Sequence, residues 1–173
     1  IVYQGAATAT ITGLTHLEGE NVVVWGNGLD LGTVDSATEW TQTYTVSGGQ
    51  IVLSAATTNV CVGLAYEASF KSSKLGMATQ DMPAPLNRVK QIDHLGLILA
   101  DVHPRGLRFG PSFDVLNDMP AIESGTSVGT ATIVDYDENP IEFPGEFKTD
   151  SRLCLLGAAP RPCTVIAACA DLG

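Results

Sequence analysis

The stretch from Gly13 to Gly28 reads GLTHLEGENVVVWGNG and contains the features that decide the fold class. Its centre, NVVVWG, is rich in β-branched residues and predicts a strand. The Asn27-Gly28 pair that follows suits a tight hairpin turn, because both residues tolerate positive φ. His16 and Glu18, one residue apart before the strand, are spaced as in metal and hydrolytic sites. The stretch therefore predicts a strand and a hairpin, and it raises the question of whether His16 and Glu18 form a site or support a turn.

The rest of the chain repeats this pattern of short β-branched runs separated by Gly, Asn, Asp and Pro, with no sustained helical period. In TQTYTVS, Tyr44 and Val46 share one face and Thr43 and Thr45 the other, as in a half-buried strand. Turn signals recur roughly every 8 to 12 residues, the spacing of a small sandwich or barrel. We predict an all-β protein of two small antiparallel β-sandwich or barrel units joined by a linker, with little helix. The predicted N-terminal strands are ATATITG, NVVVWG, WTQTYTVS, QIVLSA and VCVGLAYEASF.

The polar, proline-containing segment SSKLGMATQDMPAPL marks the predicted boundary between the units. We assign residues 1–71 to a small β-barrel or sandwich domain, 72–86 to a linker or long loop, and 87–173 to an antiparallel domain of hairpins. Three successive hairpins are predicted in the second domain, turning at HPRG, DENP and AAPRP. Helix is expected only as a turn or two near Asp114 to Asp118.

Composition and charge exclude several classes of protein. Hydrophobic residues make up 45% of the 173 residues and charged residues only 16%, which excludes a disordered chain and favours a surface covered by a partner. The net charge is −10, and residues 1–70 contain no Lys or Arg. So few bases exclude duplex nucleic-acid binding as the main function. No apolar run approaches the roughly 18 to 20 residues of a membrane-spanning helix, and the start at Ile1 is expected of a processed product or a segment of a longer protein.

Two motifs point to catalysis, but each lacks its required context. His16 and Glu18 match the H-x-E of zinc deaminases, which also need P-C-x-x-C. Here Cys163 and Cys169 stand five residues apart, so a structural histidine beside a turn is the preferred interpretation. Ser127 is the centre of a G-x-S-x-G motif, but a predicted strand follows it and all three histidines precede it, contrary to the hydrolase order. We therefore assign no catalytic residue and expect a non-enzymatic protein.

The acidic segment DYDENPIEFPGE has the ligand spacing of a calcium loop. Asp135, Asp137, Asn139 and Glu146 occupy positions 1, 3, 5 and 12 of such a loop. Pro140 stands at position 6, where the sharp turn normally requires Gly, and the flanks are predicted strands. A solvated acidic turn is preferred to a loosely held cation, and no metal or cofactor is expected.

The four cysteines are interpreted as thiols. Cys154 and Cys163 flank the predicted AAPRP turn, where a disulfide between facing strands would be geometrically possible, whereas Cys61 and Cys169 have no evident partner. Scattered cysteines in a chain of this size are more simply explained as small buried hydrophobes.

Four aromatic residues also have two interpretations. Trp25, Trp40, Tyr44 and Tyr66 lie on or near predicted strands, where aromatic rings usually form core. The alternative is a face that stacks on sugars or docks a partner.

Several longer segments resemble one family. ITGLTHLEGENVVVWGNG, VSGGQIVL and VCVGLAYEASF are similar to segments of the tail nozzle, or tail tubular protein B-like, proteins of short-tailed bacteriophages. LGLILADVHPRGLRFGPSFDVLNDMP and FPGEFKTDSRLCLLGAAPRPCTVIAA resemble the downstream part of the same proteins. The resemblance extends from about Thr10 to Ala168 and consists of turns and strands, without a catalytic signature.

The resemblance implies a structural component of the virion tail, assembled in the host bacterial cytoplasm and present in several copies around the conduit through which DNA is ejected. Its implied partners are copies of itself and other phage tail proteins, with only passive contact with DNA. The resemblance also implies that Leu14 and Leu17 anchor a turn and that His16 and Glu18 support it by hydrogen bonding. The alternative functions are a carbohydrate-binding or host-adhesion module using Trp25, Trp40 and Tyr44, and an enzyme based on Ser127 or on the carboxylates of 135–146.

Overall fold

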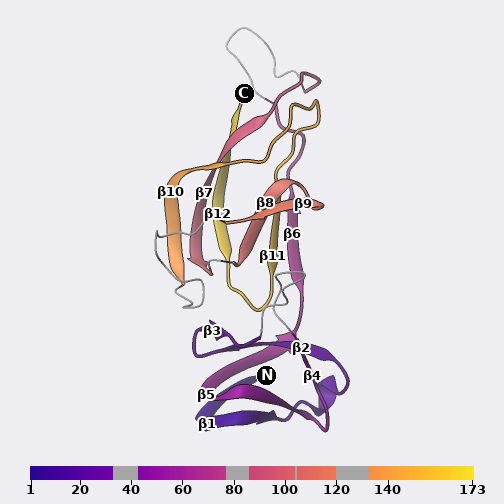
Figure 1. Ribbon diagram of the computed structural model, residues 1–173, viewed down its shortest axis with the longest axis vertical. Coiled ribbons are helices and arrows are strands. Elements are labelled where there is room, and N and C mark those ends of the chain that lie inside the picture. The colour runs from indigo at the N-terminus through magenta and orange to yellow at the C-terminus, as the bar shows by residue number, and fades with distance from the viewer. Residues whose placement is uncertain (33–42, 77–85, 104, 120–132) are drawn as a thin grey trace. The chain divides into compact units, whose positions relative to one another are not determined.

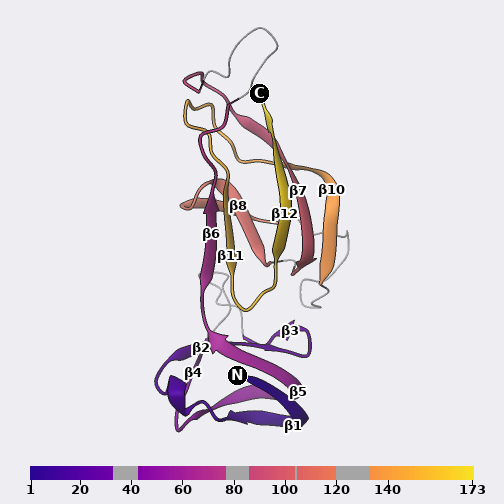
Figure 2. The same cartoon turned by 180° about the vertical axis from the view of Figure 1, so that it is seen from behind.

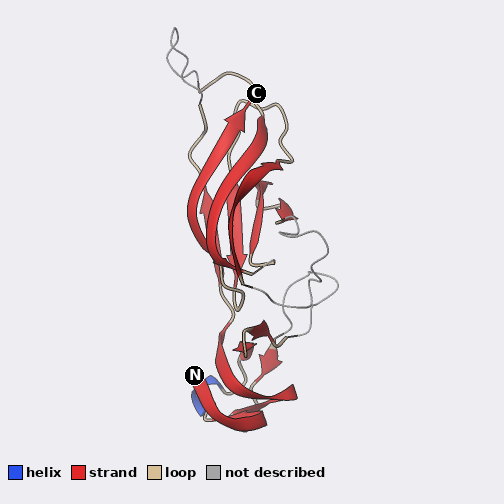
Figure 3. Cartoon of the chain, turned by 90° about the vertical axis from the view of Figure 1, so that its left-hand side faces the viewer, coloured by secondary structure: helices blue, strands red, loops and turns tan. Residues whose placement is uncertain are grey.

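The computed structural model describes residues 1–32, 43–76, 86–103, 105–119 and 133–173. Strands dominate the described residues, as predicted, and the single helical element is the 3-10 turn η1 (Thr15–Leu17) (Figure 3). The chain divides by its internal contacts into two compact units. Unit 1 consists of residues 1–67, 129–132 and 158–161, and unit 2 consists of residues 68–128, 133–157 and 162–173. No described helix is long and apolar enough to cross a membrane.

Unit 1 is built on one curled antiparallel sheet with the strand order β1-β5-β2-β3, in which β4 also pairs with β2 (Figure 1). Alternate residues of its strands form a single apolar core, in which Val22, Val24 and Leu14 are fully buried. The alternation expected in TYTV is present, since Val46 is buried while Thr45 is exposed. The strands are β1 (Val2–Thr12), β2 (Asn21–Gly26), β3 (Leu29–Asp30), β4 (Tyr44–Thr45) and β5 (Gln50–Leu64).

Two glycine-containing turns set the register of this sheet. Asn27 and Gly28 have φ values of 50° and 80° and join β2 to β3 as the predicted two-residue hairpin. Gly48 and Gly49 also have positive φ and connect Ser47 to Gln50, which form an isolated bridge. Both turns match the sequence analysis, because positive φ is a local requirement that few residue types meet.

Unit 2 is a sandwich of two antiparallel sheets. One sheet has the strand order β10-β7-β12 and the other β6-β11-β8-β9 (Figures 1 and 2). Their inner faces enclose a core that includes Leu95, Leu97, Leu99, Phe109 and Leu155. The strands are β6 (Glu67–Lys71), β7 (Ile92–Val102), β8 (Leu107–Ser112), β9 (Val115–Asp118), β10 (Val134–Glu142), β11 (Cys154–Ala158) and β12 (Thr164–Leu172).

The three hairpins predicted for this unit are wrong. The HPRG and AAPRP turns connect β7 to β8 and β11 to β12, and in each case the two strands belong to different sheets. The DENP segment is not a turn, because β10 runs through it as one strand with a register shift between Glu138 and Ile141. Pro140 is tolerated there because β10 is an edge strand. A Pro-Gly corner has the same composition whether the chain returns along its own sheet or crosses to the other one.

Three further expectations differ from the structure. QIVLSA and VCVGL form one continuous strand, β5, rather than two, since the intervening ATTN residues are all extended. The segment from Asp114 to Asp118, expected to be helical, contains β9, which pairs with β8. The contact boundary lies at Glu67/Ala68 rather than 71/72, and the backbone N–H groups of Ser72 and Leu75 donate to Leu153 and Ser151. Residues 77–85 of the predicted linker lie outside the described part of the chain.

A buried ion pair lies within unit 1. Arg161 Nε is 3.0 Å from Asp30 Oδ2, and the two side chains are only 5% and 10% exposed. Asp30 Oδ1 also accepts a hydrogen bond from the Gly32 N–H. Because both charges are removed from water, each depends on the other for stabilisation.

Replacing Arg161 by Met should destabilise unit 1 by about 3 to 5 kcal/mol, because it removes the positive charge that lies 3.0 Å from the buried Asp30 carboxylate. Both tryptophans of the chain lie in residues 1–67, so urea unfolding followed by tryptophan fluorescence reports on unit 1. The control is Glu20→Gln, which removes an exposed charge in the same unit and should leave the midpoint almost unchanged. Equal shifts for both variants would contradict the importance of burial at Arg161.

Candidate functional site

Glu18 supports the turn at Gly48-Gly49. Its two carboxylate oxygens accept hydrogen bonds of 2.8 and 2.7 Å from the N–H groups of Gly48 and Gly49. Successive N–H groups at positive φ form a concave anion-binding arrangement, which the carboxylate fills. A Cβ on Gly49 would lie 2.6 Å from Thr15 Cγ2, so this turn also requires glycine sterically.

The residues around Glu18 have structural positions as well. Leu14 is fully buried and Leu17 packs against the same core, while Gly19 has φ +80° and lets the chain reverse into β2. The His16 side chain is exposed, and no hydrogen bond joins it to a described residue. Within the Gly13–Gly28 stretch, Glu18 therefore has a structural role. His16 makes no hydrogen bond to the described residues that would add to it.

The acidic segment does not have the geometry of a calcium loop. Asp135, Asp137, Asn139 and Pro140 all lie in β10, where the chain advances about 3.3 Å per residue and cannot wrap around an ion. Asp135 Oδ1 accepts a hydrogen bond from the Asp101 N–H. Glu146, beyond the strand, pairs with Lys148 at 2.7 Å, and this hydrogen bond lowers the pKa of its carboxyl.

No group of three or more metal-ligating side chains gathers anywhere in the described residues. The side chains of Asp137 and Asn139, and all of Ser127 with its G-x-S-x-G motif, lie outside the described part of the chain.

A row of three polar residues, which the sequence did not predict, crosses the outer face of the β10-β7-β12 sheet. In this row Glu142 and Asp171 are the register partners of His94 on the neighbouring strands. Only the strand pairing brings these three residues together, so no local sequence signal could have revealed them.

All four cysteines are free, but they are not all buried. Cys154 is buried, whereas Cys61 and Cys169 are exposed, which contradicts the expectation of four buried hydrophobes. Cys154 and Cys163 do not face each other across a hairpin, because Cys154 pairs with Gly110 of β8 and the β11–β12 connection crosses between sheets. Burial raises the thiol pKa of both Cys154 and Cys163.

The aromatic residues are divided between core and surface. Tyr44 packs against the unit 1 core and its hydroxyl donates to the Leu31 carbonyl at 2.7 Å, while burial raises its pKa. Trp25 is half-buried on β2 and Tyr66 is exposed, whereas Trp40 lies outside the described residues. Tyr44 is therefore committed to the fold and is not free to stack on a sugar.

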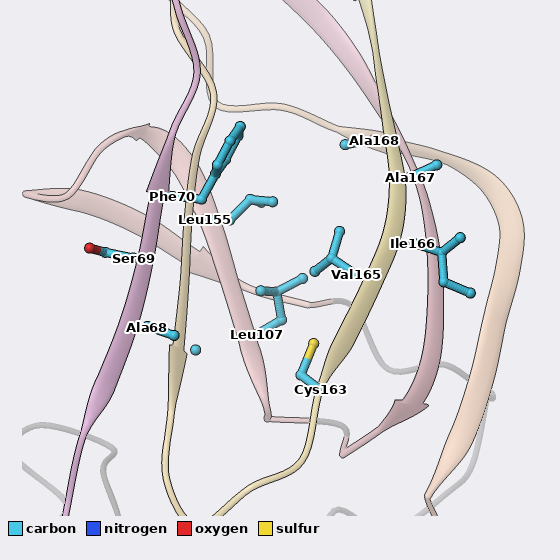
Figure 4. A pocket seen from close by; sticks show the side chains of 11 residues that line it. Ala68, Ser69, Phe70, Leu107, Leu155, Cys163, Val165, Ile166, Ala167 and Ala168 are labelled. Carbon is cyan, nitrogen blue, oxygen red and sulfur yellow. The ribbon is translucent and has the colours of Figure 1, made fainter.

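An apolar groove of about 490 Å³ lies between the two sheets of unit 2. It is bordered by β6 and β12, each of which is the edge strand of its sheet. Figure 4 shows the side chains of Phe70, Leu155, Leu107 and Val165 directed into this space. The groove therefore exposes apolar side chains beside two strands that each have a free edge.

Strand β12 is accessible along its whole length. Each of its residues is exposed or half-exposed, including Val165 (40%) and Ile166 (64%). It pairs only with β7, and between Thr164 and Ala170 it carries no charge. An apolar, uncharged strand with a free edge is a template for pairing with another strand.

Three basic side chains gather where β6 leaves the groove. Lys71, Lys74 and Arg152 all act on the Asp150 carboxyl, and the hydrogen bond from Arg152 is the main reason that its pKa is lowered. Lys71 directly follows Phe70 of the groove. This basic cluster contrasts with residues 1–70, which contain six acidic residues and no Lys or Arg. The described geometry thus combines an apolar groove, a free strand edge and a positive end.

Comparisons with known proteins yield no relative: no protein-family model and no curated protein matches this chain.

The Glu18→Ala variant should lose roughly 1 kcal/mol of unit 1 stability, because two N–H groups lose a charged acceptor and turn to water. Urea unfolding followed by tryptophan fluorescence measures the change. The control is Glu20→Ala, which removes a neighbouring exposed carboxylate and leaves the Gly48-Gly49 turn intact. A Glu20→Ala effect as large as that of Glu18→Ala would refute the structural role of Glu18.

Cys61 and Cys169 should react with iodoacetamide first, followed by Cys163, and Cys154 should react last. Exposure favours the first two, while burial and a raised pKa reduce the reactive thiolate of the others near neutral pH. Peptide mapping by mass spectrometry, in dilute protein at pH 8, gives the four rates. Early labelling of Cys154 in native protein would be inconsistent with its position in the fold.

Proposed function

We propose that this chain is a non-enzymatic structural β-module that functions by assembling with other protein chains. The observation that carries the proposal is the accessible, uncharged edge of β12 beside the apolar groove. Such a surface is a liability in an isolated protein unless a partner covers it. The polar residues that the structure describes support this assignment, since Glu18 and the Arg161–Asp30 pair serve the fold.

We further propose that the assembly is a bacteriophage tail, with the chain forming part of the nozzle through which DNA is ejected. The support for this finer assignment is the resemblance of the sequence segments to tail nozzle proteins. Two small β-units with a free sheet edge suit repeated side-by-side packing around an axis. The proposed partners are copies of this chain and other tail proteins, in the virion tail.

The charge of the chain is compatible with a conduit for DNA. A net charge of −10 repels the phosphate backbone, so that contact with passing DNA would be weak and passive. A basic surface would instead retain the nucleic acid by releasing its counterions.

Negative-stain electron microscopy of the full-length protein, mixed with the products of its neighbouring genes, tests this function. Ring-shaped or tubular assemblies are expected, with antibody against residues 1–173 decorating them. Portal and tail genes should be found among those neighbours. Particles that form without this protein and never bind it, or only monomers with all partners present, would overturn the proposal.

A further inference from the structure

We propose that the groove between β6 and β12 receives strand β1 of a second copy of this chain, which adds to the free edge of β12. This inference rests on the proposed assembly function and names the surfaces that meet. The contact would be β-strand addition, in which main-chain hydrogen bonds supply affinity and alternate side chains fill the groove.

The lengths and charges of the sheet edges single out β1 and β12. Among the described strands that end a sheet, β1 has eleven residues and β12 has nine. β1 carries no charged side chain, and β12 carries only Asp171 near its end. Natural proteins protect free edges with charge, proline, shortness or bulges. Each of these two strands contains two register shifts, but neither contains proline, and Asp171 is the one charged residue between them.

The other described edges are protected. β3 has two residues and β9 has four, so they offer little to pair with. β10 contains Pro140 and several acidic residues, while β6 has five residues and is bounded by Glu67 and Lys71. The contrast within one molecule indicates that β1 and β12 are kept pairable.

The groove supplies the apolar contact that an added strand needs. Val165 of β12 and Phe70 of β6 face into it from opposite sides and remain 40% and 53% exposed (Figure 4). Apart from Gln4, the exposed residues of β1 are small or apolar, including Val2, Ala6 and Ala7. A strand with small side chains fits between two sheets without displacing the core beneath.

Charge selects β1 of a second copy over a second β12. β1 belongs to the segment of residues 1–70, which has six acidic residues and no Lys or Arg. The basic cluster of Lys71, Lys74 and Arg152 stands at the end of the groove. Pairing β1 with β12 brings a segment without Lys or Arg toward the basic cluster, whereas pairing β12 with β12 brings together two strands whose charged residue is Asp171 in both copies. Because the two surfaces differ, the contact is heterologous and leads to a ring or an open chain of subunits.

Two lysine variants of the full 173-residue chain test this pairing by analytical ultracentrifugation. Val165→Lys places a charge in the groove and blocks the acceptor, while Val2→Lys blocks the donor strand. Wild-type protein should assemble, and each variant alone should associate on the order of tenfold more weakly or worse. An equimolar mixture should recover a one-to-one dimer, because it retains one intact donor and one intact acceptor.

Thr164→Lys is the matched control, since Thr164 neighbours Val165 on β12 and is exposed but does not line the groove. It should assemble like wild type, and circular dichroism should show that every variant keeps its strands. If Val165→Lys fails to fold, Phe70→Lys blocks the acceptor from β6 instead. A monomeric wild type, an unimpaired Val2→Lys variant, or a mixture that stays monomeric would overturn the pairing. Tail particles that incorporate a chain unable to self-associate would refute this inference while preserving the proposed function.

Discussion

The constraint on which unit 2 depends is that two small sheets must cover one apolar core. Sheets of three and four strands place every core side chain within a strand or two of an edge. On the side bordered by β10 this edge carries proline and acidic residues, but on the side bordered by β6 and β12 it remains open and apolar. The groove is therefore a consequence of the same packing that forms the core: Leu107 and Leu155 belong to the core and also line the groove.

The sequence was sufficient to predict the features that depend on local chemistry. The all-β class follows from β-branched alternation, and the turns at Asn27-Gly28 and Gly48-Gly49 follow from the few residues that adopt positive φ. Strand pairing is not local in this sense. The corner at His103 to Gly106 has the composition of a hairpin turn, yet it carries the chain from one sheet to the other because β7 pairs with β10 and β12. A hairpin is the right prediction from such a corner only when two strands that follow each other in the sequence also pair in the same sheet.

The candidate site was missed for a related reason. The run CTVIAAC follows the AAPRP turn and was predicted to be one arm of a hairpin. Its continuous apolar character, without the alternation of polar residues seen in TQTYTVS, was the signal that both faces need apolar contact. Whether a strand is central or at an edge depends on residues far away in the chain, so the run alone could not locate the groove. Glu18 was expected to support the turn in which it lies, but its carboxylate holds the N–H groups of Gly48 and Gly49, which are 30 and 31 residues away.

Charge and strand edges act over different distances, and together they explain how an open edge can persist without general aggregation. A net charge of −10 makes copies of the chain repel each other at separations up to the Debye length, about 8 to 10 Å at physiological salt. Strand addition acts only at contact, where main-chain groups and apolar side chains meet. The approach that encounters least repulsion is one that brings the lysine-free first 70 residues toward Lys71, Lys74 and Arg152. Acidic repulsion thus discourages random edge contacts, while the single basic cluster beside the groove favours one orientation in which an uncharged strand can pair.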